Sequence, residues 1–279
     1  MKMNPSGRVA VVTGAGGGIG RCISMALVEI GLVVVLIGKT RRKIEALAKC
    51  INKNERVAYT IQADITNEMK IKQEILRIEN EIGPVDILVN NAGVAGPHGP
   101  TWEVDTDEWK RCIETNLIGQ FLCTFYILPK MISRKGGRII NIVSSAGIKP
   151  IPFASAYSVG KTAFIRFSEI LASEVSKYGI TVFALHPGRV HTSMIDVVMK
   201  KIDQNEWWGR EFSRGFLQQD EVDKDSIARM IKSIASGCAD PLSGRYLSVS
   251  DNLKDLLNNI EEINDKDNLI LQIKQSSES

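Results

Sequence analysis

The sequence predicts a doubly wound α/β fold, in which helices cover both faces of a mainly parallel, seven-stranded sheet. Short runs rich in β-branched residues alternate with longer amphipathic stretches along nearly the whole chain, as in β-α-β units. The 279 residues, 44% of them hydrophobic, suffice to bury one large core. Because no repeat, low-complexity block or linker marks a boundary, we expect one domain over residues 1–250 and an extension over 251–279.

Seven runs have the length and composition of strands. They are rich in Val, Ile and Leu, and such nearly continuous apolar runs are typical of strands whose two faces are both covered. The segments between them keep apolar residues at helical spacing. In chain order, the expected strands span 8–13, 32–37, 56–61, 86–90, 138–143, 180–186 and 245–249, and the expected helices span 18–30, 41–53, 67–82, 106–132, 155–178 and 223–236.

Two regions break this alternation. Residues 189–222 carry Met and aromatic residues among charges, and they are long for a simple connection. We interpret them as a lid over a substrate site, with a buried helical excursion as the alternative. In the tail, Leu253, Leu256 and Ile260 keep helical spacing, which predicts a final helix followed by a frayed end.

Composition excludes several classes of function. The 35 basic and 32 acidic residues nearly balance, and no basic cluster favours nucleic acid. The longest apolar runs have strand length, and the N-terminus does not resemble a signal peptide, so we expect neither a membrane span nor secretion. The five cysteines form no Cys-x-x-Cys pair and the three histidines have no metal-ligand spacing, which favours reduced thiols, a cytoplasmic location and no metal.

A glycine-rich turn follows the first expected strand. It reads Thr13-Gly-Ala-Gly-Gly-Gly-Ile-Gly20 and opens a helix, with Gly14, Gly18 and Gly20 in the spacing Gly-x-x-x-Gly-x-Gly. Glycines let the backbone approach a pyrophosphate, and the positive end of the helix stabilises its charge. The turn therefore predicts a dinucleotide site, although a merely tight strand-to-helix turn would read the same way.

The second expected strand ends without a carboxylate. In NAD-binding folds, an acid near this point binds the ribose 2′-hydroxyl. Here the strand is followed by Lys39, Arg41 and Arg42, which could pair with a 2′-phosphate. We therefore expect NADP(H) rather than NAD(H), with solvated charges on the next helix as the alternative.

Tyr157 and Lys161 lie four residues apart in a helical segment, so both project from one face. A nearby ammonium favours the ionised phenol, which suits a general acid/base. The Ser144 hydroxyl, at the end of a strand, could polarise a carbonyl, although Ser145 lies beside it. A second copy of the pattern, Tyr126 to Lys130, contains Pro129, which makes it a poor helical pair, and we interpret it as a core-packed tyrosine near a helix end with a surface lysine.

With these motifs in order, the chain resembles the short-chain dehydrogenases/reductases, in the compact single-domain branch with a Rossmann-like fold. The resemblance covers about Arg8 to Val249. The matching motifs are Thr13 to Gly20, Asp64, Asn90-Asn-Ala-Gly93, Asn116, Ser144, Tyr157-Ser-Val-Gly-Lys161 and Pro187-Gly-Arg-Val-His-Thr192.

The resemblance implies a role for each catalytic residue. Tyr157 would transfer the proton, Ser144 would orient the substrate, and Lys161 would also bind the nicotinamide ribose. Asn116 would hold a water that links Lys161 to solvent, unless it only interrupts the helix.

The resemblance also implies a cofactor site. Asp64 would contact adenine, unless it caps the helix near Asn67, and Asn91 is more simply interpreted as fixing the backbone than as touching the ligand. The expected cofactor-binding residues are Gly14, Gly18, Ile19, Gly20, Lys39, Asp64, Ile65, Asn90, Gly93, Tyr157, Lys161, Pro187, Gly188, Val190 and Thr192.

The chain departs from the family at its end. Many members have a glycine pair just after the last strand, where this chain reads Ser248-Val-Ser-Asp-Asn252 and continues for nearly thirty residues. Members are commonly homodimers or homotetramers built on the two long helices at 106–132 and 155–178, and the resemblance implies the same here.

The leading hypothesis is an enzyme that interconverts a small ketone or aldehyde and an alcohol. The alternative is a catalytically silent dinucleotide-binding sensor or scaffold, although such proteins usually lose the tyrosine or lysine. Dehydration or epimerisation is a third hypothesis. Candidate substrate contacts are His98, Trp102, Phe153, His191 and Trp207, with packing within the loops as the alternative for each.

Overall fold

Seven strands form one fully parallel sheet in the computed structural model, which describes residues 8–53, 56–190, 192–202, 206–217 and 221–272. The strand order is β3-β2-β1-β4-β5-β6-β7. This confirms the predicted fold class, and each strand begins and ends within two residues of its predicted run. The strands are β1 (Val9–Thr13), β2 (Val33–Gly38), β3 (Ala58–Gln62), β4 (Val85–Asn90), β5 (Gly137–Ile142), β6 (Ile180–His186) and β7 (Tyr246–Ser248).

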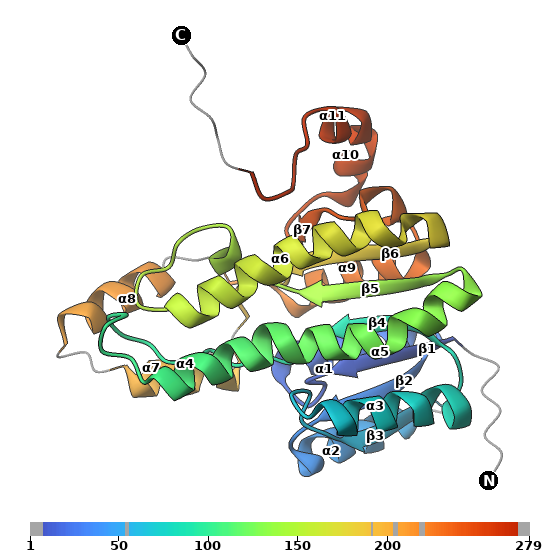
Figure 1. The fold of residues 1–279 in the computed structure, drawn as a ribbon, viewed down its shortest axis with the longest axis horizontal. Coiled ribbons are helices and arrows are strands. Elements are labelled where there is room, and N and C mark those ends of the chain that lie inside the picture. The colour runs from blue at the N-terminus through green and yellow to red at the C-terminus, as the bar shows by residue number, and fades with distance from the viewer. Residues whose placement is uncertain (1–7, 54–55, 191, 203–205, 218–220, 273–279) are drawn as a thin grey trace.

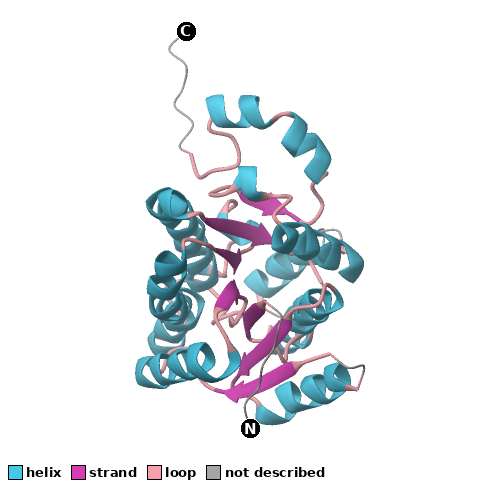
Figure 2. Cartoon of the chain, turned by 90° about the vertical axis from the view of Figure 1, so that its right-hand side faces the viewer, coloured by secondary structure: helices cyan, strands magenta, loops and turns pink. Residues whose placement is uncertain are grey.

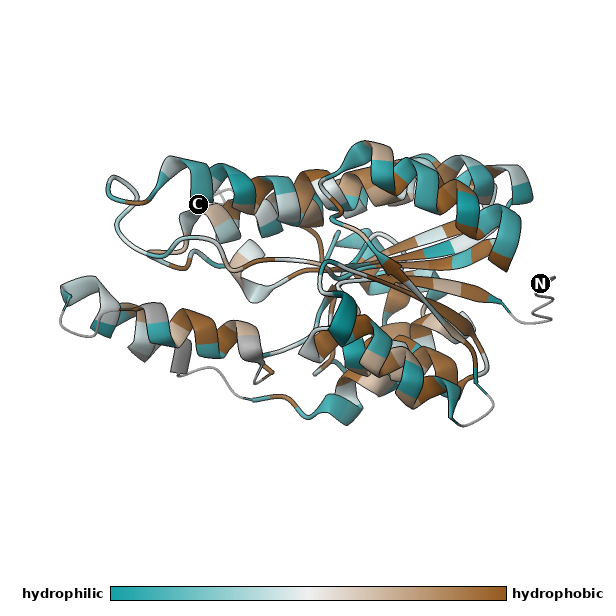
Figure 3. Ribbon diagram, turned by 90° about the horizontal axis from the view of Figure 1, so that it is seen from below, coloured by the Kyte–Doolittle hydropathy of each residue, from teal (hydrophilic) through white to brown (hydrophobic). Residues whose placement is uncertain are grey.

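Helices cover both faces of the sheet (Figures 1 and 2). Successive strand residues point to opposite faces, so Val34 and Leu36 enter one core while Val33 and Val35 enter the other. Figure 3 shows hydrophobic residues concentrated on the strands between the helical layers. One core is closed by α1 (Gly18–Glu29), α2 (Arg41–Asn52) and α9 (Lys224–Ser236), the other by α3 (Glu68–Arg77), α5 (Gly119–Arg134) and α6 (Ser155–Val175).

The winding direction reverses between β1 and β4. The chain builds β1, β2 and β3 outward in one direction and then returns to place β4 on the other side of β1. Loops that leave the carboxyl ends of β1 and β4 therefore diverge to opposite faces and leave a crevice between them, where ligands bind in folds of this kind.

Two of the predicted helices contain a turn of π-helix. The helix predicted at 67–82 is α3 followed by a π turn at Ile78–Ile82, and the one at 106–132 is α4 (Thr106–Ile113), a π turn at Glu114–Ile118 and α5. The predicted helix does continue through Pro129, which lies inside α5. Packing of the apolar face of α5 against the sheet outweighs the lost backbone hydrogen bond.

Residues 189–222 contain two helices, α7 (Ser193–Lys201) and α8 (Trp207–Leu217), which extend beyond the sheet at the left of Figures 1 and 3. Ile202, beside α7, and Phe212 of α8 are buried with Ala154 in a small apolar cluster of their own. The two helices therefore pack on the loop before α6 through a cluster separate from the two main cores.

The tail forms two short helices instead of one, α10 (Leu253–Asn258) and α11 (Ile260–Asp265). The chain then returns to the sheet edge, where Tyr246 N of β7 donates to Leu269 O at 2.7 Å. Two residues later, Leu271 N donates to Glu169 Oε1 of α6 at 2.7 Å. The last stretch, for which a frayed end is predicted, lies at 273–279, outside the described residues.

The remaining short elements are 3₁₀ turns at Ser145–Gly147, Ser176–Tyr178 and Asp240–Leu242. All five cysteines fall within the described chain and none forms a disulfide. Within the described ranges, no three His, Cys, Asp or Glu side chains gather as a metal site would require. No helix in that part of the chain combines the length and apolarity needed to span a bilayer.

Candidate active site

Three adjoining cavities form one groove along the carboxyl edge of the sheet. The first, roughly 480 Å³, shares Gly14, Ala92 and Gly93 with the second, roughly 710 Å³. The second shares Ile19, Tyr157, Thr192 and Met194 with the third, roughly 870 Å³ and partly open to solvent. The groove therefore leads from the end of β2, past the glycine turn, to Tyr157.

The glycine turn forms the floor of the middle cavity. Gly14 has φ +63°, and a Cβ added there would lie 2.7 Å from Ala92 Cα, so the residue must be glycine. A Cβ at Gly18 would lie 2.8 Å from Thr192 Cγ2, which brings the loop after β6 against the turn. No side chain caps the start of α1, so its first N–H groups remain available for a phosphate.

Thr13 and Asn91 join the loops after β1 and β4. The Thr13 hydroxyl accepts from Asn91 N at 2.9 Å and Ala92 N at 3.0 Å, and Asn91 Nδ2 donates to Thr13 O at 2.9 Å. Gln120 also donates to the Ala92 carbonyl. Asn91 thus fixes the backbone, as predicted. The roles of Thr13 and Gln120 were not predicted, although Gln120 lies one helical turn after Asn116.

Asn90, expected in the groove wall, lies behind it. It is the last residue of β4 and its side chain points into the helical layer, where it is fully buried. Its Nδ2 donates to Thr124 Oγ1 and to Asn141 Oδ1, both at 2.9 Å. Asn90 therefore does not line the groove as expected. Its side chain instead holds the ends of β4 and β5 against α5.

At the far end of the groove, Lys39 and Asp64 form an ion pair of 2.7 Å. Burial raises the pKa of Asp64, but hydrogen bonds from Lys39 and Thr66 outweigh it and hold the pKa below its ordinary value. Asn67, rather than Asp64, caps α3 by accepting from Lys70 N at 3.0 Å. Lys39, Asp64 and Ile65, which were expected to bind the cofactor, all line the first cavity.

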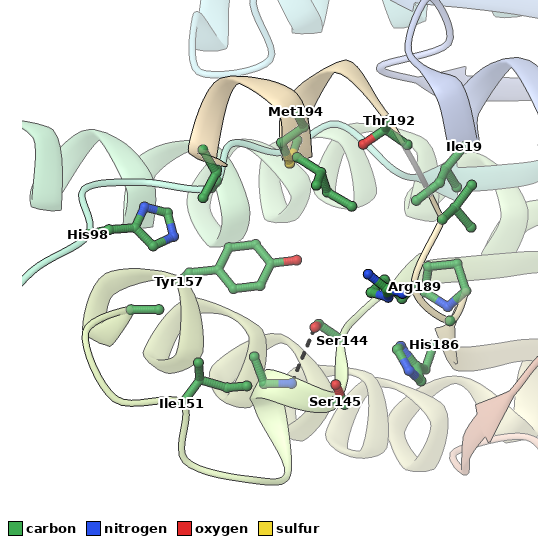
Figure 4. A pocket seen from close by; sticks show the side chains of 18 of the residues that line it. Ile19, His98, Ser144, Ser145, Ile151, Tyr157, His186, Arg189, Thr192 and Met194 are labelled. Carbon is green, nitrogen blue, oxygen red and sulfur yellow. Dashed lines mark hydrogen bonds between the residues drawn. The ribbon is translucent and has the colours of Figure 1, made fainter. Parts of the chain in front are cut away.

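Tyr157 and Ser144 line the third cavity, as Figure 4 shows. Tyr157 also lines the second cavity, together with Lys161. Tyr157 lies in the first turn of α6, and Lys161 Nζ lies 5.7 Å from the centre of its ring. Ser144 follows β5, and its Oγ accepts from Ala146 N at 3.2 Å. Ser145 lines the same cavity. The fold therefore brings three of the four predicted catalytic residues to the junction of the two cavities.

The pKa of Tyr157 is raised, contrary to the expected lowering by lysine. Burial of the phenol outweighs the stabilisation that the Ser144 hydroxyl gives to the phenolate. The ammonium of Lys161 is directed to the backbone, where it donates to Ile142 O at 2.7 Å. Burial lowers the pKa of Lys161 to about 8, so its charge is easily lost.

Asn116 lies in the π turn between α4 and α5 and is fully buried. Its Oδ1 accepts from Val94 N at 2.9 Å and its Nδ2 donates to Val94 O at 2.8 Å. Nδ2 also lies 3.2 Å from Cys112 Sγ. The amide thus holds the loop after β4 in place, one layer behind the groove. π turns of this kind often mark functional sites.

The third cavity has a mainly apolar wall. Among the candidate substrate contacts, His98 lines it. Trp102 is largely exposed, whereas Phe153 and Trp207 pack edge to face at 5.3 Å outside the lining, and His191 lies outside the described residues. Pro187, Gly188, Val190 and Thr192, which were expected to bind the cofactor, also lie in this wall. The apolar side chains in the lining include Ile19, Ile151, Met194, Ile195, Val198 and Phe212.

Two polar residues in this wall were not predicted, His186 and Arg189. His186 directly precedes the Pro187 to Thr192 motif and Arg189 lies within it, and this position was the only available signal. Burial lowers the pKa of His186 to about 4, which leaves the imidazole neutral at neutral pH.

Comparisons with known proteins agree with this geometry. The family model described as short chain dehydrogenase matches residues 8–203. A short chain dehydrogenase of Pseudocercospora fijiensis is 36% identical over 67% of this chain, and the match spans 61% of that relative. A 3-oxoacyl-[acyl-carrier-protein] reductase of Synechocystis is 35% identical over 68% of this chain and 76% of its own length.

A solved structure has the same fold over most of both chains. The crystal structure of a variant of actinorhodin polyketide ketoreductase with NADPH is 30% identical, with a TM-score of 0.79, and the alignment covers 88% of this chain and 97% of that one. Taken with the glycine turn, the groove and the Ser144, Tyr157 and Lys161 arrangement, these matches show that the chain belongs to the short-chain dehydrogenase/reductase family of oxidoreductases.

Proposed function

We propose that this protein interconverts a ketone or aldehyde and the corresponding alcohol, with NADP(H) as cofactor and Tyr157 as general acid/base. The observation that carries the proposal is the position of Tyr157, whose side chain lines both the middle cavity and the third cavity. A dinucleotide fits the groove, since its middle is floored by glycines whose added Cβ atoms would clash and by an uncapped helix start.

Each residue of the site has its own role in the proposed reaction. Bound nicotinamide would supply or accept the hydride. Ser144 orients the substrate oxygen toward Tyr157, which gives its proton to that oxygen in reduction and takes it back in oxidation. The raised pKa of Tyr157 keeps the phenol protonated at neutral pH, which suits reduction. In this proposal, Asn116 would hold a water that links Lys161 to solvent, and a proton would return to the Tyr157 phenol along this path.

Replacing Tyr157 with Phe tests the proposal. We expect Tyr157→Phe to lower ketone-dependent oxidation of NADPH by about 10²- to 10⁴-fold, because no proton donor remains, while NADPH still binds. Tyr126→Phe is the matched control, since Tyr126 heads the second Tyr-x-x-x-Lys pattern but donates to Glu68 on the surface. Nicotinamide absorbance measures turnover and fluorescence measures binding. Equal activity of wild type and Tyr157→Phe would contradict the proposal, and binding without turnover in wild type would indicate the sensor alternative.

NADP(H) preference rests on the cations beside the first cavity. Lys39 lines that cavity, Arg41 and Arg42 begin α2, and Gly38 stands at the end of β2 in place of an acid. The ion pair with Asp64 positions Lys39 and still leaves two of its three N–H donors for a 2′-phosphate. The Arg41 side chain is held by Glu45 at 2.7 Å.

A titration with both cofactors tests this preference. Wild type should bind NADPH more tightly than NADH, and Lys39→Ala should reduce the ratio of the two affinities on the order of tenfold, since one charge-assisted contact is lost. Lys49→Ala removes the same charge from the far end of α2 and should leave the ratio unchanged. Tighter binding of NADH by wild type would refute the preference.

Residues 189–222 act as a lid in this proposal. Met194, Ile195 and Val198 of α7 and Phe212 of α8 supply one apolar side of the substrate cavity. These helices pack through a cluster separate from the main cores, so they can move without disturbing the sheet. Closure over a bound substrate would exclude water from the reaction.

A further inference from the structure

We propose that the C-terminal strap, residues 268–271, is a positioning element for the proposed catalytic residues, so that turnover depends on a segment outside the groove. The inference rests on the proposed oxidoreductase function and adds the part of the chain that holds its residues in place. The structure describes all four strap residues, and none of them lines the three cavities of the groove.

The strap is bound to the edge of β7. Tyr246 N donates to Leu269 O at 2.7 Å, and Arg245 Nη1 donates to Asn268 O at 3.1 Å. The backbone of Leu269 has φ +63°, a conformation that residues other than glycine rarely adopt, so the surrounding contacts have to hold it there. A bare edge strand offers unpaired backbone groups, and here the end of the same chain takes one of them.

Helix α6 binds the backbone of Leu271 from both sides. Glu169 Oε1 accepts from Leu271 N at 2.7 Å, and Arg166 donates to Leu271 O. The two side chains also form an ion pair of 2.6 Å, and Glu169 is only 9% exposed. Hydrogen bonds to charged groups are among the stronger ones in proteins. Leu271 is therefore firmly tied to the helix whose first turns carry Tyr157 and Lys161.

The Leu271 side chain packs on a small apolar cluster next to the catalytic residues. The buried members of the cluster are Val143, Phe164, Ile165 and Ala184, and the partly buried side chains packed on them are Leu117, Phe167, Tyr246 and Leu271. Val143 directly precedes Ser144, and Leu117 directly follows Asn116. Leu271 therefore closes a cluster that adjoins both the strand end at Ser144 and the π turn at Asn116.

The same cluster adjoins Lys161 and the turn after Ser144. Lys161 Nζ donates to the carbonyl of Ile142, the chain neighbour of a cluster residue. A Cβ added at Gly147 of the 3₁₀ turn would lie 2.6 Å from Ile165 Cδ1. Loosening the cluster would therefore shift the serine hydroxyl and the lysine ammonium relative to a bound carbonyl, and a misplacement of about 1 Å can lower a rate on the order of 10²-fold.

Tyr246 links the strap to the substrate cavity. Its backbone binds Leu269, and its side chain packs on the cluster that Leu271 closes. The Tyr246 ring also stacks on His186, with 6.2 Å between the ring centroids and 22° between the planes. Because His186 lines the third cavity, the strap supports the cavity wall as well as the catalytic residues.

A charge placed at Leu271 tests the inference. Leu271→Asp should release the strap, because a carboxylate would otherwise be buried in an apolar cluster. The probe is whichever of cyclohexanone, acetophenone and ethyl acetoacetate wild type reduces fastest with NADPH. We expect kcat to fall on the order of 10- to 100-fold and the Kd for NADPH to change by less than about twofold, since the strap touches neither cofactor cavity.

Ile270→Asp is the matched control. It adds the same charge one residue away, and Ile270 belongs to none of the apolar clusters that the described residues form. Its kcat should stay near the wild-type value, and so should that of Leu271→Met, which keeps an apolar side chain. A general loss of folded protein would instead lower turnover and NADPH binding together.

Glu169→Leu reaches the strap from α6. It removes the acceptor for Leu271 N without altering the strap, so it should also lower kcat and leave NADPH affinity unchanged. Hydrogen exchange followed by mass spectrometry locates the effect. Residues 143–147 and 155–165 should exchange faster in Leu271→Asp and Glu169→Leu than in wild type, whereas α2 should not change.

Two results would overturn the inference and leave the oxidoreductase function standing. They are a kcat that neither Leu271→Asp nor Glu169→Leu lowers, and a fall that Ile270→Asp shares. If wild type reduces none of the three ketones, the proposed function fails instead. Hydrogen exchange then decides the strap by itself, since unchanged exchange at 143–147 and 155–165 would show that the strap does not hold these segments.

Discussion

Burying the charged side chain of Lys161 beside the proposed catalytic tyrosine destabilises the folded state. Its side chain is almost fully buried, and its ammonium has a single described hydrogen bond, to the Ile142 carbonyl at 2.7 Å. The pKa falls from 10.5 to about 8 because burial disfavours the charged form. The folded state therefore holds this proton less tightly than the unfolded state, and charged Lys161 lowers the free energy of unfolding.

The pH dependence of stability should reveal this cost. Below pH 8, Lys161 is charged in both the folded and the unfolded state, so the folded state carries the full cost of burying the charge. Above pH 10.5, Lys161 is neutral in both states and this cost is absent. The free energy of unfolding of wild type, relative to Lys161→Met, should therefore rise by roughly 3 kcal/mol between these limits. Urea unfolding at several pH values measures it. The exposed Lys49→Met should show no such rise, and a constant difference for Lys161→Met would contradict the assignment.

Among the elements, the loop after β6 links the cofactor groove to the substrate cavity. Thr192 lies against Gly18 of the glycine turn, while Arg189 and Val222 join the loop to the segment before α9. Gly188 is the point where this segment turns, with φ +71° and Val222 directly against it. The position of the whole loop therefore depends on the absence of a side chain at Gly188.

Gly188→Ala should displace this loop. We expect a loss of about 1–3 kcal/mol in the free energy of unfolding and weaker NADPH binding, because the added methyl meets Val222 as well as the unfavourable φ. Gly31→Ala is the control, since φ is +88° there and nothing lies within 4 Å of the added Cβ. Adding Val222→Ala to Gly188→Ala should recover part of the loss. Equal losses in the two single variants would show that backbone strain alone is responsible.

At the scale of the whole molecule, apolar side chains remain exposed on the outer face of the two long helices. Ile118, Phe121 and Phe125 lie at helical spacing across the π turn and α5, and Val159 and Ile170 lie on α6, each 40–52% exposed. The Phe121 ring contacts Phe167 of α6 at 6.0 Å, so the stripe crosses between the helices. The free edge of β7, in contrast, receives the returning tail through Leu269.

We expect the protein to form a homodimer through this stripe. Phe125→Glu should convert it to a monomer, because a charge would have to be buried between the subunits. Light scattering after size exclusion measures the mass. Met69→Glu, an equally polar change at the exposed Met69 of α3, is the control and should leave the assembly intact. A wild-type monomer, or a Phe125→Glu variant that still assembles, would refute this interface.

The sequence by itself determined the order of the seven strands and of the main helices that cover them, and it predicted the proposed catalytic residues. These features are local: strand and helix periodicity is set by neighbouring residues, and the four-residue spacing of Tyr157 and Lys161 places both on one face of α6 wherever that helix lies. The glycine turn could also be predicted from the sequence, because its proposed function depends on backbone freedom at closely spaced positions.

Only the tertiary structure decided which side chains meet across the sheet. Lys39 pairs with Asp64 because β2 and β3 are neighbours, and Asn90 is buried because Asn141 of the adjacent β5 lies beside it. Arg189 enters the substrate cavity because Glu221 and Val222 hold its backbone from more than thirty residues away. Such pairings and burials depend on strand order and packing, which no local pattern specifies.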